Sequence, residues 1–185
     1  CDEKTLKTAI LAGADTILLE DAKLSSRCIN DKDLKINNFN KISFLAKTAR
    51  NLNKDIKLVF NLDIIAHDHH FDLISKLIDE LVRANIKFIR VQDIGIYYFI
   101  KQKFSSFKFY FCSNTGNKNY LSIKEYSNYF IRQNLNNDLD YSDICEISDK
   151  TKSQFEIIVH GPLLLQQSYR RFLLSFNSNL KKNYG

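Results

Sequence analysis

Residues 6–19 read LKTAILAGADTILL, and this stretch decides the fold of the chain. Leu6, Ala9 and Ile10 fall on one face of a helix. Gly13 follows where a helix commonly ends, because glycine readily adopts the left-handed backbone of a helix C-terminus. Residues 16–19, TILL, then predict a short buried strand. A helix, a tight turn and a strand form the α-to-β connection of an α/β protein.

The same alternation of helix and strand continues along the rest of the chain. Further helices are expected at residues 42–52, 71–84, 96–102, 120–127 and 139–150. Strands are expected at residues 16–19, 55–61, 86–91, 107–112, 129–131 and 155–159. The clearest helix is the second of these, whose apolar residues keep the 3–4 spacing at Leu73, Ile74, Leu77, Ile78 and Leu81. Such alternation predicts a parallel sheet covered by helices.

This pattern favours a TIM-barrel-like parallel (β/α) barrel over an open doubly wound sheet. No G-x-G-x-x-G follows any expected strand, which argues against a dinucleotide-binding fold. Because the chain opens on a helix, we expect a strand upstream of Cys1 and an incomplete barrel whose last unit is also missing. There is one proline and no linker-like segment, so residues 1–185 are expected to form a single domain.

Composition narrows the class of protein. The 185 residues carry a net charge of +6, but the charges are scattered and form no long basic run. The four cysteines, Cys1, Cys28, Cys112 and Cys145, lie far apart and form no CxxC pair, so neither a zinc ribbon nor a disulfide framework is expected. Reduced thiols and a cytoplasmic location are the expectation. No apolar run is long enough to span a bilayer.

Polar residues stand where the expected strands end. In a parallel barrel the carboxyl ends of the strands converge on one face, and that face carries the chemistry. Any one of these residues is explained by contact with solvent, but the set indicates a functional site. The strand-exit residues are Glu20, Asn61, Asp93, Ser113, Arg132 and His160.

The last of these exits lies in residues 155–175, FEIIVHGPLLLQQSYRRFLLS. The expected strand ends at His160 and is followed by a segment that carries Ser168, Arg170 and Arg171. The two arginines suit a phosphate or carboxylate ligand. The alternative is a solvated helix face opposite an apolar one.

Two nucleophilic pairs can be drawn with His160. Cys112 and His160 both stand at strand ends, but Cys112 follows an aromatic-rich strand, which favours a buried, inert thiol. Ser168 with His160 lacks the G-x-S-x-G elbow of a serine hydrolase. Neither pair is distinctive.

The densest group of metal-ligand residue types is His67-Asp68-His69-His70. His67 and His69 would share one side of an extended segment, but a metal site needs a further ligand in a fixed position. The alternative, which we favour, is that these residues cap the helix that starts near Phe71. No metal site is therefore predicted, and His67 and His69 are the residues to inspect.

Several of these segments resemble peptidase family U32, the collagenase-like proteases. The most specific one is residues 156–174, with Val159-His160-Gly161 and Ser168-x-Arg-Arg. The others match in chain order and are residues 6–19, Asn61 with His67, residues 91–95, Ser113 with Asn119-Tyr120, and Arg132.

The resemblance implies a TIM-barrel-like domain. The family is named for peptidases, but several members resemble oxygen-independent hydroxylation factors for tRNA or rRNA bases or ubiquinone precursors, with an iron–sulfur cluster held by cysteines. Carried onto this chain, the implied catalytic residues are His160, Arg132 and Asn61. The implied substrate-binding residues are Asp93, Ser113, Ser168, Arg170 and Arg171.

The chain departs from the family pattern at the cluster. Leu164 and Arg171 stand at two signature cysteines, Tyr169 at the glycine between them, and Gln133 at the glutamate after the family's arginine. We therefore expect no cofactor and no cluster of the chain's own. The expected function is an enzyme or accessory subunit of RNA base modification, with RNA and a cluster-bearing U32 paralogue as candidate partners. The alternatives are a peptidase and a non-catalytic partner of such a paralogue.

Overall fold

The computed structural model describes residues 2–21, 24–25, 40–113 and 116–161. The helices are α1 (Glu3–Leu11), α2 (Asn40–Leu52), α3 (Phe71–Arg83), α4 (Ile94–Lys103), α5 (Tyr120–Tyr126) and α6 (Tyr141–Lys150), with a short 3₁₀ turn, η2 (Asp68–His70), before α3. The strands are β1 (Thr16–Glu20), β2 (Lys57–Leu62), β3 (Phe88–Val91), β4 (Lys108–Phe111), β5 (Arg132–Asn134) and β6 (Gln154–Glu156).

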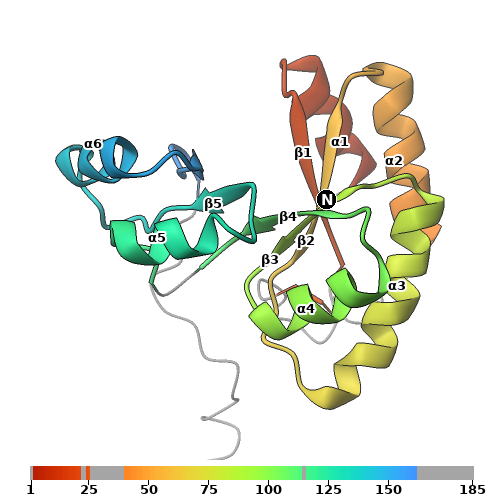
Figure 1. The fold of residues 1–185 in the computed structure, drawn as a ribbon. Coiled ribbons are helices and arrows are strands. Elements are labelled where there is room, and N and C mark those ends of the chain that lie inside the picture. Colours follow the sequence, from red (N-terminus) through yellow and green to blue (C-terminus); the bar gives the residue numbers. More distant parts are fainter. Residues whose placement is uncertain (1, 22–23, 26–39, 114–115, 162–185) are drawn as a thin grey trace, which may run out of the picture.

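The strands form one parallel sheet in the order β1-β2-β3-β4-β5-β6 (Figure 1). Each strand pairs with the next one along the chain. A doubly wound sheet would reverse its order at a switch point, whereas this unbroken order is typical of a barrel. The prediction of a parallel, barrel-like (β/α) sheet is confirmed, and in the described residues it is a curled, open part of a barrel with β1 and β6 as its edges.

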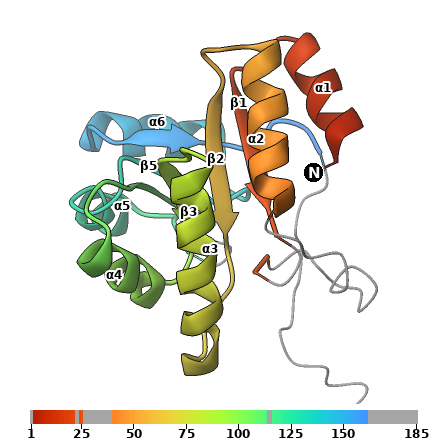
Figure 2. The ribbon, with the colours of Figure 1, turned by 90° about the vertical axis from the view of Figure 1, so that its right-hand side faces the viewer.

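The main apolar core lies between the sheet and helices α1 to α4. Figure 2 shows α1, α2 and α3 side by side over β1, β2 and β3. Alternate strand residues such as Phe60 and Ile89 are fully buried in this core, together with Leu77 of α3. A smaller core of Ile123, Leu135 and Ile147 joins α5 and α6 to the far end of the sheet. The helices therefore cover one face of the sheet, and they do not cover the other, concave face.

The opening turn takes the predicted form. Gly13 has a φ of +97°, in the region that favours glycine, directly after α1. The amide of Ala14 donates to the carbonyl of Ala9 (3.0 Å), so the last turn of the helix is closed before β1 begins.

Strand β5 was expected at residues 129–131, and that prediction is wrong, since the strand runs from Arg132 to Asn134. Phe130 is 3% exposed and its ring stacks on Phe111 with 4.9 Å between centroids. Residues 129–131 have a high β propensity, but Phe130 packs into the core instead of pairing as part of a strand. Pairing with β4 therefore begins after it, at Arg132. Arg132 therefore lies inside the sheet and not at a strand exit.

Strand β6 is also shorter than expected. The apolar run at residues 155–159 predicts a buried strand, but β6 ends at Glu156. Ile157, Ile158 and Val159 are 52%, 40% and 86% exposed. An edge strand has a neighbour on one side only, so apolar residues beyond its paired part find nothing among the described residues to cover them.

None of the helices in the described part of the chain combines the length and the apolarity needed to cross a bilayer.

Candidate functional site

A row of polar side chains crosses the sheet at one level. Successive register pairs link Glu20 to Asn61, Asn61 to Arg90, Arg90 to Tyr110, Tyr110 to Arg132 and Arg132 to Gln154. Residues paired in a parallel sheet point to the same face. We call these six residues the inner polar row, which consists of Glu20, Asn61, Arg90, Tyr110, Arg132 and Gln154.

The inner polar row lies on the concave face, away from the helices. Its neighbours in sequence, such as Leu19, Phe60 and Phe109, belong to the helix-side core, and successive strand residues alternate between faces. In a barrel that only needs stability, this interior layer is filled by Val, Ile and Leu. A layer made of a carboxylate, two amides, two guanidinium groups and a phenol is therefore the strongest candidate for a functional site.

Two arginines of this row, Arg90 and Arg132, form ion pairs with the same carboxylate, that of Glu156. Arg90 Nε lies 3.3 Å from Glu156 Oε2, and Arg132 Nη1 lies 3.9 Å from Glu156 Oε1. The Arg90 side chain is 8% exposed, while the Arg132 and Glu156 side chains are 27% and 25% exposed. The N–H of Arg90 Nε is not aimed at the carboxylate and makes no hydrogen bond, although the ion-pair distance is short. The two arginines therefore share one carboxylate that satisfies neither of them fully.

Tyr110 lies between the two arginines in the register. It is 2% exposed, and the Arg132 guanidinium carbon lies 5.0 Å from the centre of its ring, a cation–π arrangement. Burial raises the pKa of Tyr110, the charge of Glu156 raises it further, and the positive charge of Arg132 opposes both. The phenol is therefore neutral at physiological pH and holds Arg132 against the sheet.

Asn61 supplies a buried acceptor to the same row. It is 1% exposed, and its Oδ1 has no hydrogen-bond partner among the described residues. A buried polar atom without a partner costs free energy, so native proteins rarely keep one unless a ligand or water uses it. Asn61 is paired in register with Arg90. An oxygen without a hydrogen-bond partner, Asn61 Oδ1, therefore stands on the strand next to a nitrogen without one, Arg90 Nε.

The structure brings three of the predicted strand-exit residues, Glu20, Asn61 and Arg132, onto one face of the sheet. Sequence reasoning missed Arg90, Tyr110 and Glu156, because it searched strand ends and these residues lie within strands. The signal that could have found Arg90 is a single charge between Ile89 and Val91 in a buried strand.

Asp93 takes a different position. Its Oδ1 accepts a hydrogen bond from the amide of Gly95 (2.7 Å), capping α4, and its Oδ2 accepts one from the amide of Ala66 (2.9 Å). Both carboxylate oxygens are engaged by backbone, so this side chain fastens the loop after β2 to the start of α4.

Replacing Asp93 by alanine is expected to lower the free energy of unfolding by about 1–2 kcal/mol, because the cap of α4 and the tether to Ala66 are both lost. Asp93→Asn is the matched control, since its amide oxygen can keep the bond to Gly95 while the other bond is lost, so about half the effect is expected. Urea denaturation followed by circular dichroism measures both. Full stability of Asp93→Ala would contradict the capping role.

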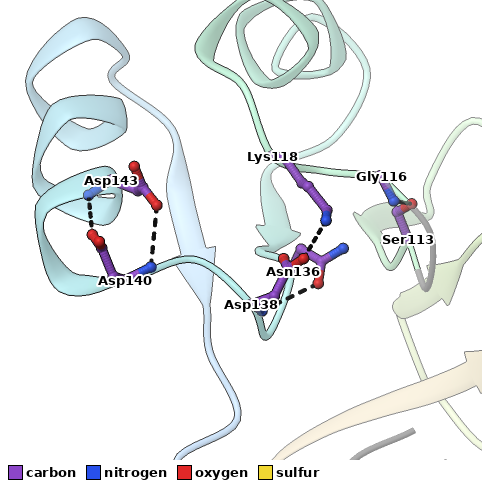
Figure 3. Close-up of polar contacts among 7 residues, drawn as sticks. All are labelled: Ser113, Gly116, Lys118, Asn136, Asp138, Asp140 and Asp143. Atoms are coloured by element: carbon purple, nitrogen blue, oxygen red, sulfur yellow. Dashed lines mark hydrogen bonds and ion pairs between the residues drawn. The ribbon is translucent and has the colours of Figure 1, made fainter. Parts of the chain in front are cut away.

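Ser113 and the loops after β4 and β5 are held by local contacts (Figure 3). The amide of Gly116 donates to Ser113 Oγ (3.0 Å), and Lys118 forms an ion pair with Asp138 that joins the two loops. The amide of Asp138 donates to Asn136 Oδ1 (3.3 Å). Figure 3 also shows Asp140 and Asp143 bonded to each other's amides at the start of α6, a reciprocal cap.

The other predicted residues do not join the inner polar row. His160 is exposed beyond β6, and Ser168, Arg170 and Arg171 lie outside the described residues. His67 and His69 are exposed, with ring centres 5.6 Å apart. The amide of His67 donates to His70 Nδ1 (2.9 Å), as expected for residues that cap the segment before α3. Among the described residues no three His, Cys, Asp or Glu side chains are grouped to hold a metal ion.

Gln133 faces the opposite side of the sheet from the inner polar row. It is fully buried, its Nε2 donates to the carbonyl of Ile123 in α5 (2.8 Å), and its Oε1 accepts from Asn117 Nδ2 (3.2 Å). Asn117 Nδ2 also donates to the carbonyl of Asn134 (3.1 Å). This buried amide network fixes the loop before α5 to β5, so Gln133 serves the fold and does not line the concave face.

One family model and several solved structures match this chain. The model of peptidase family U32 matches residues 2–185. A 2,3-dimethylmalate lyase of the PEP mutase/isocitrate lyase superfamily is 10% identical with a TM-score of 0.58, covering 98% of this chain and 80% of that one. A glycerophosphodiester phosphodiesterase from Parabacteroides distasonis is 11% identical with a TM-score of 0.59, covering 87% and 77%.

An oxaloacetate acetylhydrolase is 12% identical with a TM-score of 0.54, and covers 80% of this chain and 60% of that one. At such identities these likenesses show the fold alone. The search of curated proteins gives no match.

Proposed function

Because this chain belongs to peptidase family U32, we propose that it serves in RNA base modification of the hydroxylation type, as an enzyme or as the substrate-binding subunit of one. The observation that carries the proposal is the inner polar row, in which Arg90 and Arg132 present positive charge on the concave face. A guanidinium group stacked on an aromatic ring, as Arg132 is on Tyr110, suits planar and anionic ligands. The net charge of +6 favours a polyanionic partner.

The iron–sulfur cluster implied by the family resemblance does not fit the cysteines of the residues that the structure describes, Cys112 and Cys145. Such clusters are held by several cysteine thiolates. Cys112 is 2% exposed on the concave side of β4, and Cys145 lies half-buried on α6, on the other side of the sheet. The positions that resemble the family's signature cysteines hold Leu164 and Arg171. We therefore assign no step to a cluster in this chain.

A second candidate function is that of a partner to a cluster-bearing paralogue. The observation that favours it is the exposed apolar run of Ile157, Ile158 and Val159 beside the edge strand β6, together with the replaced cysteines. Copurification of such a paralogue with the tagged chain would support this role, whereas modification of RNA by the purified chain alone would support an enzyme. No contact among the described residues favours the peptidase alternative.

The proposal predicts that RNA binds this chain with a steep dependence on salt, because binding phosphate releases counterions. Filter binding of a short single-stranded RNA should give a linear fall of log affinity with log salt concentration. Arg132→Gln should weaken binding and reduce the slope by about 1, as expected for one lost phosphate contact.

Lys7→Gln is the matched control for this experiment. It also removes one positive charge, but Lys7 lies on the outer helix α1, paired with Glu3, so it should leave RNA binding unchanged. No RNA retention at low salt, together with an unchanged RNA nucleoside profile in a deletion strain, would overturn the proposed function.

A further inference from the structure

We infer that Arg90 and Arg132 form a binding site for an oxyanion, the phosphate or carboxylate of a small organic ligand, in the place that the Glu156 carboxylate fills in this structure. Asn61 Oδ1 accepts a hydrogen bond from an O–H or N–H of the same ligand. This inference rests on the concave face that carries the proposed function, but it concerns a small ligand and can be tested without RNA.

Glu156 fits its two arginine partners poorly. Good guanidinium–carboxylate pairs have N–O distances near 2.7–2.9 Å and are often bidentate. Here the N–O distances are longer, 3.3 Å to Arg90 and 3.9 Å to Arg132. The Nε atoms of both arginines are buried without a hydrogen bond among the described residues. The site therefore offers donors that its own carboxylate leaves unused.

Glu156 lies at the end of a short strand. It is the last residue of the three-residue strand β6, at the edge of the sheet that the described residues form, and residues 157–161 after it are exposed. The Arg90 and Tyr110 side chains lie in the middle of the sheet and are buried. Glu156 can therefore move aside through a change at the edge, while the two residues that hold the site together stay fixed.

The charges and the hydrogen-bonding atoms of the site favour one kind of ligand. Arg90 and Arg132 pair with the single carboxylate of Glu156, so this group of three carries an excess positive charge, which favours an anionic ligand. Glu20, the other carboxylate of the row, lies two strands away from Arg90. Asn61, 1% exposed and paired in register with Arg90, adds an acceptor without a partner. A ligand that satisfies all these atoms has an anionic group and, next to it, a hydroxyl or an N–H. Nucleotides and hydroxy acids both have this combination.

The geometry explains why the site is reached from one side. The Arg132 and Glu156 side chains are about a quarter exposed, whereas Arg90 is buried beneath them. An incoming anion therefore meets Arg132 first and reaches Arg90 as Glu156 withdraws. Arg132, packed on Tyr110, is the entry residue, and Arg90 is the inner one.

Glu156→Gln tests this directly, because it removes the competing charge and keeps the shape of the side chain. Isothermal titration of the full chain with inorganic phosphate, succinate, uridine and uridine 5′-monophosphate should show anion affinity raised about three- to tenfold by this change. Arg132→Gln should lower it by about tenfold or more. Uridine, which lacks an anion, should bind neither variant more tightly than the native chain.

The melting temperature gives a second readout. Glu156→Gln leaves two buried or half-buried guanidinium groups without a carboxylate, so the variant should melt lower in anion-free buffer. Saturating phosphate or succinate should then raise its melting temperature more than that of the native chain. Glu146→Gln on α6 is the matched control, since it removes an exposed carboxylate paired with Lys150 and should change neither readout.

Tighter binding of phosphate and uridine 5′-monophosphate by Glu156→Gln supports the inference and assigns the anion to a nucleotide. Tighter binding of succinate alone supports it and assigns a carboxylate. Equal affinity in the native chain, Glu156→Gln and Arg132→Gln overturns it. RNA retention by the native chain, together with equal anion affinity in all three forms, would leave the proposed function standing and refute this site, while anion binding without RNA retention would do the reverse.

Discussion

Gln133→Glu is expected to lower the free energy of unfolding by about 3 kcal/mol at neutral pH, because it places a buried charge where the fold needs a donor. Gln133 is fully buried, and its Nε2 donates to the carbonyl of Ile123 at 2.8 Å. A carboxylate oxygen in that place would face the carbonyl oxygen without a proton between them. The remaining bond, from Asn117 Nδ2, offsets only part of this cost.

The stability that Gln133→Glu loses should depend on pH in a definite direction. Burial would raise the pKa of a carboxyl group at position 133 above its unfolded value, and its protonated form could donate to Ile123. The free energy of unfolding of the variant is therefore closest to that of the native chain at acidic pH. It loses stability as pH rises through the ordinary carboxyl range, up to the raised pKa of the folded state. Urea denaturation of both proteins at several pH values measures the difference.

Gln154→Glu is the matched control, with the same chemical change one strand away. Gln154 is exposed and its Oε1 accepts from Arg132 Nη2 (3.3 Å), so a carboxylate there faces a positive charge and solvent. Its effect should stay within about 0.5 kcal/mol. Equal stabilities of Gln133→Glu and Gln154→Glu at neutral pH would show that the buried amide network does not hold α5 to β5.

Leu77→Ala is expected to cost about 3 kcal/mol through the lost apolar contacts and the cavity left behind. Leu77 lies in α3, is fully buried, and faces the main core between the helices and the sheet. Since single domains are stable by only about 5–15 kcal/mol, this change removes a large share of the total. The measurement is the urea midpoint from far-UV circular dichroism, with the slope checked for two-state behaviour.

Val82→Ala, in the same helix, is the control for this prediction. Val82 is 52% exposed, and alanine has the higher helix propensity, so its effect should be near zero or slightly stabilising. A cost at position 82 equal to that at position 77 would contradict the burial of one helix face that the 3–4 spacing predicts.

The element types follow from the sequence because their signals are local. In α3 the side chains that meet the core recur every three or four residues, so the pattern is visible without knowing what they pack against. Gly13 marks the end of α1 by its own backbone requirement. The order of these elements, helix and strand in turn, then implies a parallel sheet with each strand beside the next.

The ends of the last strands could not be predicted in the same way. The β propensity of residues 129–131 and 157–159 is high, yet pairing starts later in β5 and stops earlier in β6. Phe130 packs into the core, and β6 pairs with one strand, β5, among the described residues. Both effects depend on residues distant in sequence.

The sequence by itself determined the helices, the first four strands, the parallel order of the sheet and the presence of polar residues near the ends of strands. Only the tertiary structure decided which of those residues meet. Asn61, Arg90 and Arg132 share the inner polar row because the register of β2, β3, β4 and β5 places them at one level. Asp93 caps a helix, and Gln133 turns to the other face. The physical reason is that helix periodicity is set by neighbours along the chain, whereas a site on a sheet is set by the register between strands far apart in sequence.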